Sequence, residues 1–309
     1  MNYFKNKKIV VTGGAGFLGF HVVTRLLESA YDIEIPRSYE CDLRKLNNCI
    51  ELTVNKDVVI HLAGNVGGIG YNQKNPGTLF YDNLMMGVNI IEACRINQVK
   101  KVVIVGTICS YPKFTKVPFK EDDLWNGYPE ETNAPYGIAK KSLLVMAQAY
   151  RQQYGMNIIY LMPVNLYGPG DNFNEESSHV IPALIQKIEE AKKLSLPSIE
   201  VWGTGEASRE FLYIDDCAEA IILATEKYNK PDPINIGYGK EIKIKDLVIT
   251  LCDLIGYNGK IVWNKSKPDG QPRRLLDTSK AKKEFGFKAK TDFLKGLEET
   301  IMWYNNYYD

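Results

Sequence analysis

The chain has 309 residues, of which 45% are hydrophobic and 24% are charged, and its formal net charge is +1. There is no basic excess to favour a nucleic-acid partner, and no apolar run approaches the roughly 20 residues of a membrane span. At about 150 residues per domain, the length allows two domains or one elaborated domain.

Cysteine spacing and the N-terminal sequence favour a cytoplasmic protein. The six cysteines show neither C-x-x-C nor Cys/His metal spacing, which is typical of reduced thiols and predicts no metal site. Lysines near the N-terminus lead directly into a short apolar strand, so we expect no signal peptide.

A glycine-rich loop follows the first expected strand, residues 9–11. Its sequence is Thr12-Gly13-Gly14-Ala15-Gly16-Phe17-Leu18-Gly19, and apolar residues continue after it at helical spacing. A strand, a glycine loop and a helix in this order are typical of a dinucleotide site, because glycines let backbone N–H groups approach a pyrophosphate at the positive end of the helix. The alternative is a glycine-rich turn in an unrelated α/β domain. We expect cofactor contacts from Gly13, Gly16, Phe17, Leu18 and Gly19.

Arg37 follows the second expected strand, residues 32–35, about 20 residues past the glycines. Sites for NAD place an acid at this point for the ribose 2′-OH, whereas an arginine can hold the 2′-phosphate of NADP. Glu34 lies inside the strand rather than at its end. We therefore predict NADP(H) as the cofactor, with Arg37 at the 2′-phosphate; the alternative is that Arg37 is a solvated loop charge.

The third expected strand, residues 57–62, ends in a glycine-rich run that begins with Ala63 and Gly64. Open parallel sheets bind ligands at the C-terminal ends of their strands, and glycines there let the backbone lie against a ligand. We expect Ala63 and Gly64 to contact the cofactor. His61 lies inside the strand, where a core histidine with satisfied ring nitrogens is a simpler explanation than an acid or a base.

After a helix expected at residues 81–97, the strand at 101–106 brings Thr107 to the same edge of the sheet. Tyr136 and Lys140 open the next helical run and share one of its faces, because they are four residues apart. A cation beside a phenol favours the phenolate, so we expect Lys140 to lower the pKa of Tyr136, a general acid for a carbonyl group that is being reduced. The hydroxyl of Thr107 is expected to bind the same carbonyl; the alternative is that Thr107 is only a strand-end residue. The alternative for Tyr136 is a half-buried tyrosine at a helix start.

The chain changes character after the strand expected at 157–161, where proline and glycine punctuate shorter elements. The later elements are expected, in order, as helices that open at His179 and Asp215, a strand pair around a turn at 201–205 and 209–213, a strand at 234–237, and helices at 245–255 and 294–304. The fold class is therefore α/β: a Rossmann-type doubly wound parallel sheet with a smaller, interleaved C-terminal substrate lobe.

Three motifs, the loop from Thr12 to Gly19, the strand-end Thr107 and the Tyr136-x-x-x-Lys140 pair, together resemble the extended short-chain dehydrogenase/reductase family of nucleotide-sugar enzymes. Longer runs resemble the GDP-L-fucose synthases within that family: VGGI at 66–69, YDNLMM at 81–86, CSYPK at 109–113, NLYGPGDNF at 165–173, SSHVIPAL at 177–184 and VWGTG at 201–205. Together with the three motifs, these runs are spread from residue 12 to residue 205.

The resemblance implies NADPH-dependent conversion of GDP-4-keto-6-deoxy-D-mannose to GDP-L-fucose, by epimerisation at C3 and C5 and reduction of the C4 ketone. Cys109 and His179 match the residues that move protons in the epimerisation; hydrogens beside a ketone are acidified because an enolate can form. Tyr136 would steady the enolate oxygen and later protonate O4, and Lys140 would also hold the nicotinamide ribose. The alternatives are a small buried hydrophobe for Cys109 and a surface histidine at a helix start for His179.

The resemblance also implies further contacts, mainly in the C-terminal half. They are Arg209 with the nucleotide diphosphate, Trp202 with the base or ribose, Asn165 near the sugar diphosphate, Val180 and Lys187 with the substrate, and Pro163 with the cofactor. The alternative for Arg209 is a surface ion pair with Glu206 or Glu210. Two positions depart from the family: Thr107 stands where serine is usual, and Lys187 replaces an arginine, which loses bidentate geometry. Both departures bear on the preferred base and sugar.

The resemblance implies that the chain has two domains and pairs with a second copy of itself. Residues 1–164 with about 211–238 would form the NADP-binding domain, and about 165–210 with 239–309 the nucleotide-sugar-binding lobe. The resemblance implies a homodimer formed through the helix at 81–97 and the helix of Tyr136.

Single residues distinguish this chain from enzymes of the same fold that have other functions. A 4,6-dehydratase of this family carries adjacent acids after the strand-end threonine, where this chain has Ile108 and Cys109. Arg37 disfavours a C4 epimerase that retains NAD. The alternatives that remain are a C4 reductase or epimerase of another nucleotide-bound 4-keto sugar, and a non-catalytic NADP-binding sensor, which can dispense with the tyrosine and the lysine.

Overall fold

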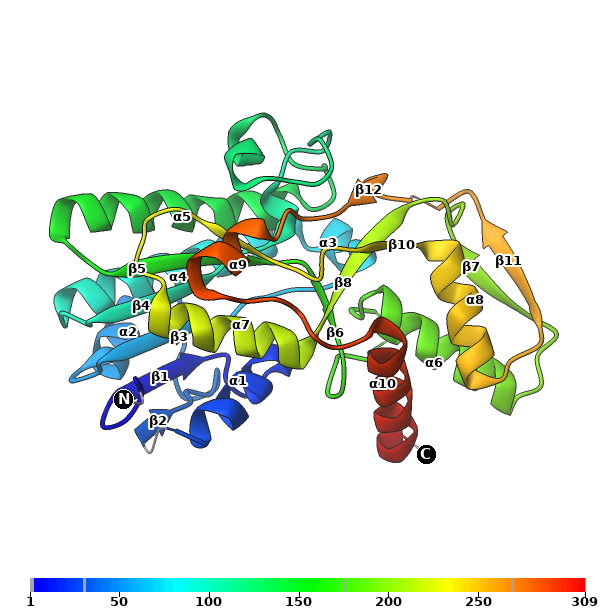
Figure 1. Cartoon of the computed structure of the whole chain (residues 1–309), viewed down its shortest axis with the longest axis horizontal. Coiled ribbons are helices and arrows are strands. Elements are labelled where there is room, and N and C mark those ends of the chain that lie inside the picture. Colours follow the sequence, from blue (N-terminus) through cyan, green and yellow to red (C-terminus); the bar gives the residue numbers. More distant parts are fainter. Residues whose placement is uncertain (1–2, 30–31, 175, 268, 309) are drawn as a thin grey trace.

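The structure, a computed structural model, describes residues 3–29, 32–174, 176–267 and 269–308. Its larger layer is a six-stranded sheet in the order β2-β1-β3-β4-β5-β9, in which every neighbouring pair is parallel (Figure 1). The strands are β1 (Lys8–Thr12), β2 (Asp32–Glu34), β3 (Val58–His61), β4 (Lys101–Val105), β5 (Ile158–Pro163) and β9 (Ile234–Ile236).

Helices cover both faces of this sheet (Figure 1). On one face α1 (Phe17–Leu27) packs against α7 (Ile214–Lys227), and on the other α4 (Pro76–Ile96) packs against α5 (Ala134–Tyr154). The shorter α2 (Leu46–Thr53) lies against α4. The predicted doubly wound fold is therefore confirmed.

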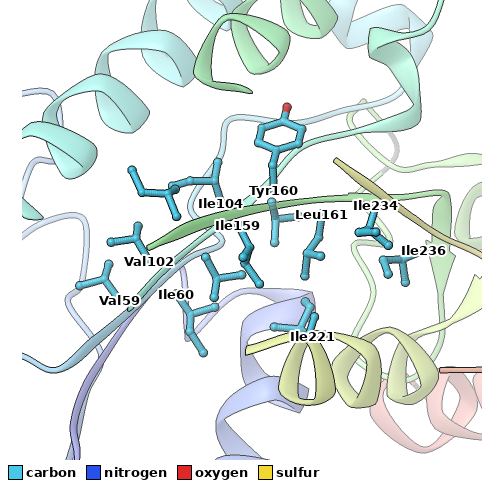
Figure 2. Close-up of a cluster of buried hydrophobic side chains, with 14 of the residues drawn as sticks. Val59, Ile60, Val102, Ile104, Ile159, Tyr160, Leu161, Ile221, Ile234 and Ile236 are labelled. Atoms are coloured by element: carbon cyan, nitrogen blue, oxygen red, sulfur yellow. The ribbon is translucent and has the colours of Figure 1, made fainter. Parts of the chain in front are cut away.

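The sheet is buried because its strands are rich in β-branched side chains. In Figure 2, Val59, Val102 and Ile104 lie on one face of neighbouring strands, whereas Ile60 lies on the opposite face, the side on which Ile221 of α7 is found; all five side chains are at most 1% exposed. A parallel sheet covered on both faces requires such apolar runs. Each of these side chains contributes about 1.5 to 3 kcal/mol when fully buried, so the sheet holds the strand ends in fixed positions.

A smaller lobe forms from the C-terminal half of the chain. Its four-stranded sheet is built around β8 (Ser208–Tyr213), which pairs with β6 (Asn165–Tyr167), β10 (Glu241–Lys243) and β12 (Arg273–Arg274). A second hydrophobic cluster lies under it and is supplied largely by α6 (Val180–Lys193), α8 (Ile244–Ile255) and α10 (Phe293–Tyr308). The remaining elements are α3 (Ile69–Lys74), η1 (Ile108–Ser110), η2 (Glu121–Trp125), β7 (Ser198–Trp202), β11 (Lys260–Asn264) and α9 (Ser279–Phe285).

The expected strand pair at 201–205 and 209–213 is wrong. The first strand, β7, pairs in parallel with β11, whereas the second, β8, joins the other sheet of the lobe. Gly203 and Gly205 both have positive φ, and the backbone N–H of Gly203 donates to the carbonyl of Asn264. The chain therefore turns away between the strands instead of closing a hairpin.

Two other features were not anticipated along the chain. Helix α4 begins at Pro76 rather than near residue 81, because proline is well suited to the first turn of a helix. Helix α9 packs against α7 and β9, and Leu276 and Phe285 join the larger core. The predicted domain boundaries stay a prediction. Among the residues described, none of the helices combines the length and apolar character needed to cross a bilayer.

Candidate active site

The end of β4 leads into the single turn η1, which fixes Thr107 and Cys109. Thr107 caps this turn, and its Oγ1 accepts a hydrogen bond from the backbone N–H of Cys109 at 3.2 Å. The hydroxyl of Ser110 donates to the carbonyl of Gly137 at 2.9 Å, which ties the turn to α5. The strand end and the helix start therefore form one rigid unit.

Tyr136 lies in the first turn of α5 and is 8% exposed. Burial raises its pKa, negative charge at Cys109 raises it further, and a hydrogen bond with Thr107 opposes these effects. The prediction that Tyr136 has a lowered pKa is therefore wrong, because desolvation of the phenolate outweighs the favourable contacts. The predicted neighbourhood of Thr107 and Tyr136 is present, since Thr107 lies close enough to the phenol to lower its pKa.

Lys140 is buried beneath the site, and its ammonium donates to the carbonyl of Val105 at 3.3 Å. Burial lowers its pKa to about 8. His61 lies near it with no exposed surface, and Nδ1 of His61 and Oγ1 of Thr12 are 2.8 Å apart. Burial, with a smaller effect from Lys140, lowers the pKa of His61 to about 3. The prediction that His61 is a buried core residue is confirmed, but the prediction that both ring nitrogens are satisfied is not, because its Nε2 has no hydrogen-bond partner among the described residues.

Cys109 is half-buried between two polar groups. Its thiol donates to Oδ1 of Asn133 at 3.8 Å, and Nη1 of Arg274 donates to its Sγ at 3.6 Å. Sequence reasoning missed Arg274. The available signal was the pair Arg273-Arg274, because neighbouring residues of a strand point to opposite faces of the sheet. In the structure Arg274 is buried and Arg273 is exposed.

The charge of Arg274 also lowers the pKa of two more of the predicted residues, His179 and Arg209. His179 precedes α6 as its N-cap residue, and although part of its surface is exposed, desolvation by the surrounding protein and then the charge of Arg274 lower its pKa. Burial and, secondarily, the charge of Arg274 lower the pKa of Arg209 to about 9. The structure thus brings Cys109, His179 and Arg209 around one buried guanidinium.

The predicted substrate residues occupy the facing lobe. Arg209 in β8 is buried, and its guanidinium donates to the carbonyls of Ser208 at 2.7 Å and Asp269 at 2.9 Å. Glu206 pairs instead with Lys243 and Lys245. The alternative of an ion pair between Arg209 and Glu206 is therefore not realised.

The other substrate candidates differ in exposure. Asn165 donates to the carbonyl of Glu210 at 2.9 Å, and Val180 begins α6. Trp202 is 48% exposed at the end of β7, with Nζ of Lys267 4.9 Å from its ring centroid. Lys187 is exposed and donates to the carbonyl of Glu200 at 2.8 Å. Trp202 and Lys187 therefore offer surfaces that a ligand can reach.

The glycine loop has the shape that a pyrophosphate requires. Gly13 has a φ of +70°, and a Cβ on it would lie 2.7 Å from the backbone nitrogen of Ala63. A Cβ on Gly19 would lie 2.0 Å from the carbonyl oxygen of Gly13. Gly16 is the N-cap residue of α1 and makes no side-chain capping bond, so no capping side chain occupies the first backbone N–H groups of this helix and they can bind a phosphate. These residues fit a dinucleotide.

The remaining cofactor candidates lie along the same edge of the sheet. Phe17 and Leu18 begin α1, Arg37 is exposed beyond β2, and Pro163 ends β5. Gly64 lies beside Lys140, whose Nζ would be 3.5 Å from a Cβ placed on Gly64. The absence of a side chain at Gly64 therefore keeps the space above Lys140 open.

Comparison with known proteins defines the class. The model of the family described as "NAD dependent epimerase/dehydratase family" matches residues 9–237. The chain belongs to this family.

Within the family, the chain is similar to named GDP-L-fucose synthases. It is 39% identical to the Probable GDP-L-fucose synthase 1 of Oryza sativa subsp. japonica, over 97% of this chain and 92% of the relative. It is 37% identical to the GDP-L-fucose synthase of Escherichia coli (strain K12), over 96% of each chain.

Solved structures agree with this placement. A GDP-L-fucose synthetase from Naegleria fowleri bound to NADP matches with a TM-score of 0.90 at 28% identity, over all of this chain (100%) and 97% of that chain. A GDP-6-OMe-4-keto-L-xylo-heptose reductase from C. jejuni matches with a TM-score of 0.91 at 29% identity, over 97% of this chain and 98% of that chain.

Proposed function

We propose that this chain is a GDP-L-fucose synthase, which uses NADPH to convert GDP-4-keto-6-deoxy-D-mannose to GDP-L-fucose. The observation that carries the proposal is the turn in which Cys109 lies two residues from Thr107, whose side chain neighbours the Tyr136 phenol. We infer that a proton shuttle thereby lies beside a proton donor for a ketone. The similarity to named GDP-L-fucose synthases over nearly the whole chain supports the same substrate.

Different residues of the chain would carry out the epimerisation and the reduction. Cys109 and His179 remove and return the protons at C3 and C5, and the hydroxyls of Thr107 and Tyr136 hold the oxygen on which enolate charge develops. Tyr136 then gives its proton to O4. NADPH, when bound, supplies the hydride for C4. Lys140 stabilises negative charge at the tyrosine and binds the nicotinamide ribose.

Binding would involve both lobes. Gly13, Gly16, Phe17, Leu18 and Gly19 hold the cofactor pyrophosphate, Arg37 its 2′-phosphate, and Ala63, Gly64 and Pro163 line the path to the nicotinamide. The facing lobe takes the GDP-linked 4-keto-6-deoxy sugar, with Arg209 at the diphosphate. Asn165, Val180, Lys187 and Trp202 complete this side.

We infer a cytoplasmic homodimer joined through α4 and α5. Both helices keep large apolar side chains at least 41% exposed, namely Tyr81, Ile96, Val145 and Tyr154. All six cysteines are free thiols, which suits a reducing compartment. Sedimentation of the purified protein would separate a dimer from a monomer.

The test of the function is direct. The purified protein is mixed with NADPH and GDP-4-keto-6-deoxymannose, the nicotinamide absorbance is followed, and the sugar product is identified by NMR. We expect oxidation of NADPH with formation of GDP-L-fucose. Binding of NADPH without its consumption would contradict the substrate assignment.

A second candidate is a C4 reductase for another nucleotide-bound 4-keto sugar. Two observations favour it: the similarity to the C. jejuni heptose reductase, and Lys187, whose ammonium is engaged by the carbonyl of Glu200. A lysine there binds phosphate as a point charge rather than bidentately. A panel of GDP-linked keto sugars in the same assay separates the two candidates.

Replacing Cys109 with alanine tests the epimerisation. We expect Cys109→Ala to lose solvent deuterium incorporation at C3 and C5, because the variant lacks the group that exchanges protons with these carbons. NADPH affinity is expected to stay within about threefold, since no hydrogen bond of the glycine loop changes. Cys41→Ala is the matched control. Retained exchange at both carbons in Cys109→Ala would remove Cys109 from the mechanism.

The buried Lys140 predicts a pH dependence. Because burial lowers its pKa to about 8, the ammonium is present below that pH and is lost as the pH rises through it. We expect kcat/KM for NADPH to fall above about pH 8, and Lys140→Met to give a low, flat profile. A wild-type profile that stays level up to about pH 9.5 would contradict the role of Lys140.

A further inference from the structure

Two side chains outside the predicted set hold the sulfur of Cys109 from different directions. Asn133 precedes α5 and accepts the thiol hydrogen bond through its Oδ1, and Arg274 of β12 donates to the sulfur. Both are 7% exposed. One neighbour therefore suits the protonated sulfur, and the other suits the thiolate.

The orientation of the Asn133 amide is fixed by Glu130. The Nδ2 of Asn133 donates to Oε2 of Glu130 at 2.5 Å, and an ionised carboxylate only accepts hydrogen bonds. The amide oxygen must therefore face the other way. There it accepts from Nδ2 of Asn72 at 3.0 Å and from the thiol of Cys109. Because Asn72, Glu130 and Asn133 are all buried, this arrangement cannot be replaced by water without a local opening.

The orientation of Arg274 is fixed in a similar way by Gln271. The Nε2 of Gln271 donates to the carbonyls of Lys113 at 2.8 Å and Pro112 at 3.3 Å, which only accept. Its Oε1 is therefore turned to Nε of Arg274, 2.9 Å away. Gln271 is 3% exposed. The guanidinium is held by the protein itself in the position from which Nη1 reaches the sulfur.

We propose that Asn133 and Arg274 are positioning residues for the two protonation states of Cys109. Asn133 binds the thiol, and Arg274 binds the thiolate. The inference rests on the proposed function. When the sulfur gives its proton to a carbon beside the ketone, the S–H bond breaks, a C–H bond forms, and the electron pair left on sulfur faces the guanidinium. When the thiolate removes a proton from such a carbon, the C–H bond breaks, its electron pair passes into the enolate, and the newly formed S–H group donates a hydrogen bond to Oδ1 of Asn133.

Alkylation of Cys109 tests the proposal without turnover. The full-length protein is treated with iodoacetamide near neutral pH, and modification is measured on the Cys109 peptide by mass spectrometry, with Cys109→Ala as the blank. The thiolate is the reacting form. We expect Asn133→Ala to raise the rate about 2- to 10-fold, since a lost hydrogen bond frees the proton. We expect Arg274→Gln to lower it about 10-fold or more, and Arg274→Lys to recover most of the rate.

Catalysis supplies the second readout. In Asn133→Ala and Arg274→Gln, deuterium incorporation into the sugar is expected to slow about 10-fold or more, with KM within about threefold, because proton transfer rather than binding is affected. The matched controls are Asn126→Ala, an exposed asparagine bonded to Asp123, and Arg273→Gln, the exposed neighbour of Arg274.

Opposite shifts of the alkylation rate are the signature of the proposal. If both variants shift the rate in the same direction, or match their controls, the two residues merely support the fold and the inference is overturned. Failure of the wild-type protein to consume NADPH would instead contradict the proposed function. The alkylation rates would still decide whether Asn133 and Arg274 bind the thiol and the thiolate of Cys109.

Discussion

Replacement of Tyr136 by phenylalanine is expected to lower the rate of NADPH oxidation about 10²- to 10⁴-fold, the range for loss of a general acid. The phenol is the only group of this side chain that can protonate O4, and the ring itself packs with little exposed surface. NADPH affinity should stay within a few-fold because the cofactor contacts lie elsewhere. Stopped-flow absorbance and a fluorescence titration measure the two effects.

The control for this prediction lies on the same helix. Tyr150 of α5 donates its hydroxyl to Glu92 at 2.8 Å, so Tyr150→Phe removes an equivalent hydroxyl away from the strand edge. It should turn over at the wild-type rate. Near-normal turnover of Tyr136→Phe would refute the role assigned to the phenol.

Replacement of Glu210 by alanine is expected to cost about 2 to 6 kcal/mol of unfolding free energy. Glu210 has no exposed surface, and its carboxylate accepts the backbone N–H groups of Gly239 at 2.6 Å and Leu276 at 2.7 Å. Each buried N–H left without an acceptor costs about 1 to 3 kcal/mol. These two bonds hold the segments that follow β9 and β12 against β8, beside Arg209. Urea denaturation measures the loss.

An exposed glutamate of the same lobe provides the comparison. Glu206 bonds to Lys243 and Lys245 on the surface, and removal of such a pair costs about 1 kcal/mol or less. Equal losses in Glu210→Ala and Glu206→Ala would show that the buried bonds do not hold the lobe together.

Local sequence signals were sufficient for the central fold. The strands of the main sheet are short runs of valine and isoleucine between polar or glycine-rich segments, so β1, β3, β4 and β5 were predicted within one or two residues. The glycine loop and the i, i+4 spacing of Tyr136 and Lys140 are also local, and both lie where the sequence indicated.

The pairing of strands that are distant in the sequence could not be predicted from such local signals. Strand β7 pairs with β11, about 60 residues further along the chain, and no local pattern distinguishes that partner from β8. The sign of the Tyr136 pKa shift was missed for a related reason. Spacing places a lysine on the same face of the helix but does not reveal the extent of burial, and burial is the largest of the effects on this phenol.

The surroundings of Cys109 also depended on contacts between distant segments. Asn133 and Arg274 come from loops or short strands without periodicity, and their orientation is set by Glu130 and Gln271. The amide and guanidinium groups become informative only when their hydrogen-bond partners are known. The same holds for Arg209, whose alternative role as an ion-pair partner of Glu206 is ruled out only by its bonds to backbone carbonyls and by the pairing of Glu206 with two lysines.

The most direct test of the account is to run the wild-type reaction with NADPH in D₂O and to locate deuterium in the sugar product by NMR. Epimerisation followed by reduction predicts deuterium at C3 and C5 and protium at C4, where the hydrogen arrives as hydride. Protium at both C3 and C5 with a reduced C4 would contradict the proposed epimerisation and leave a simple C4 reductase.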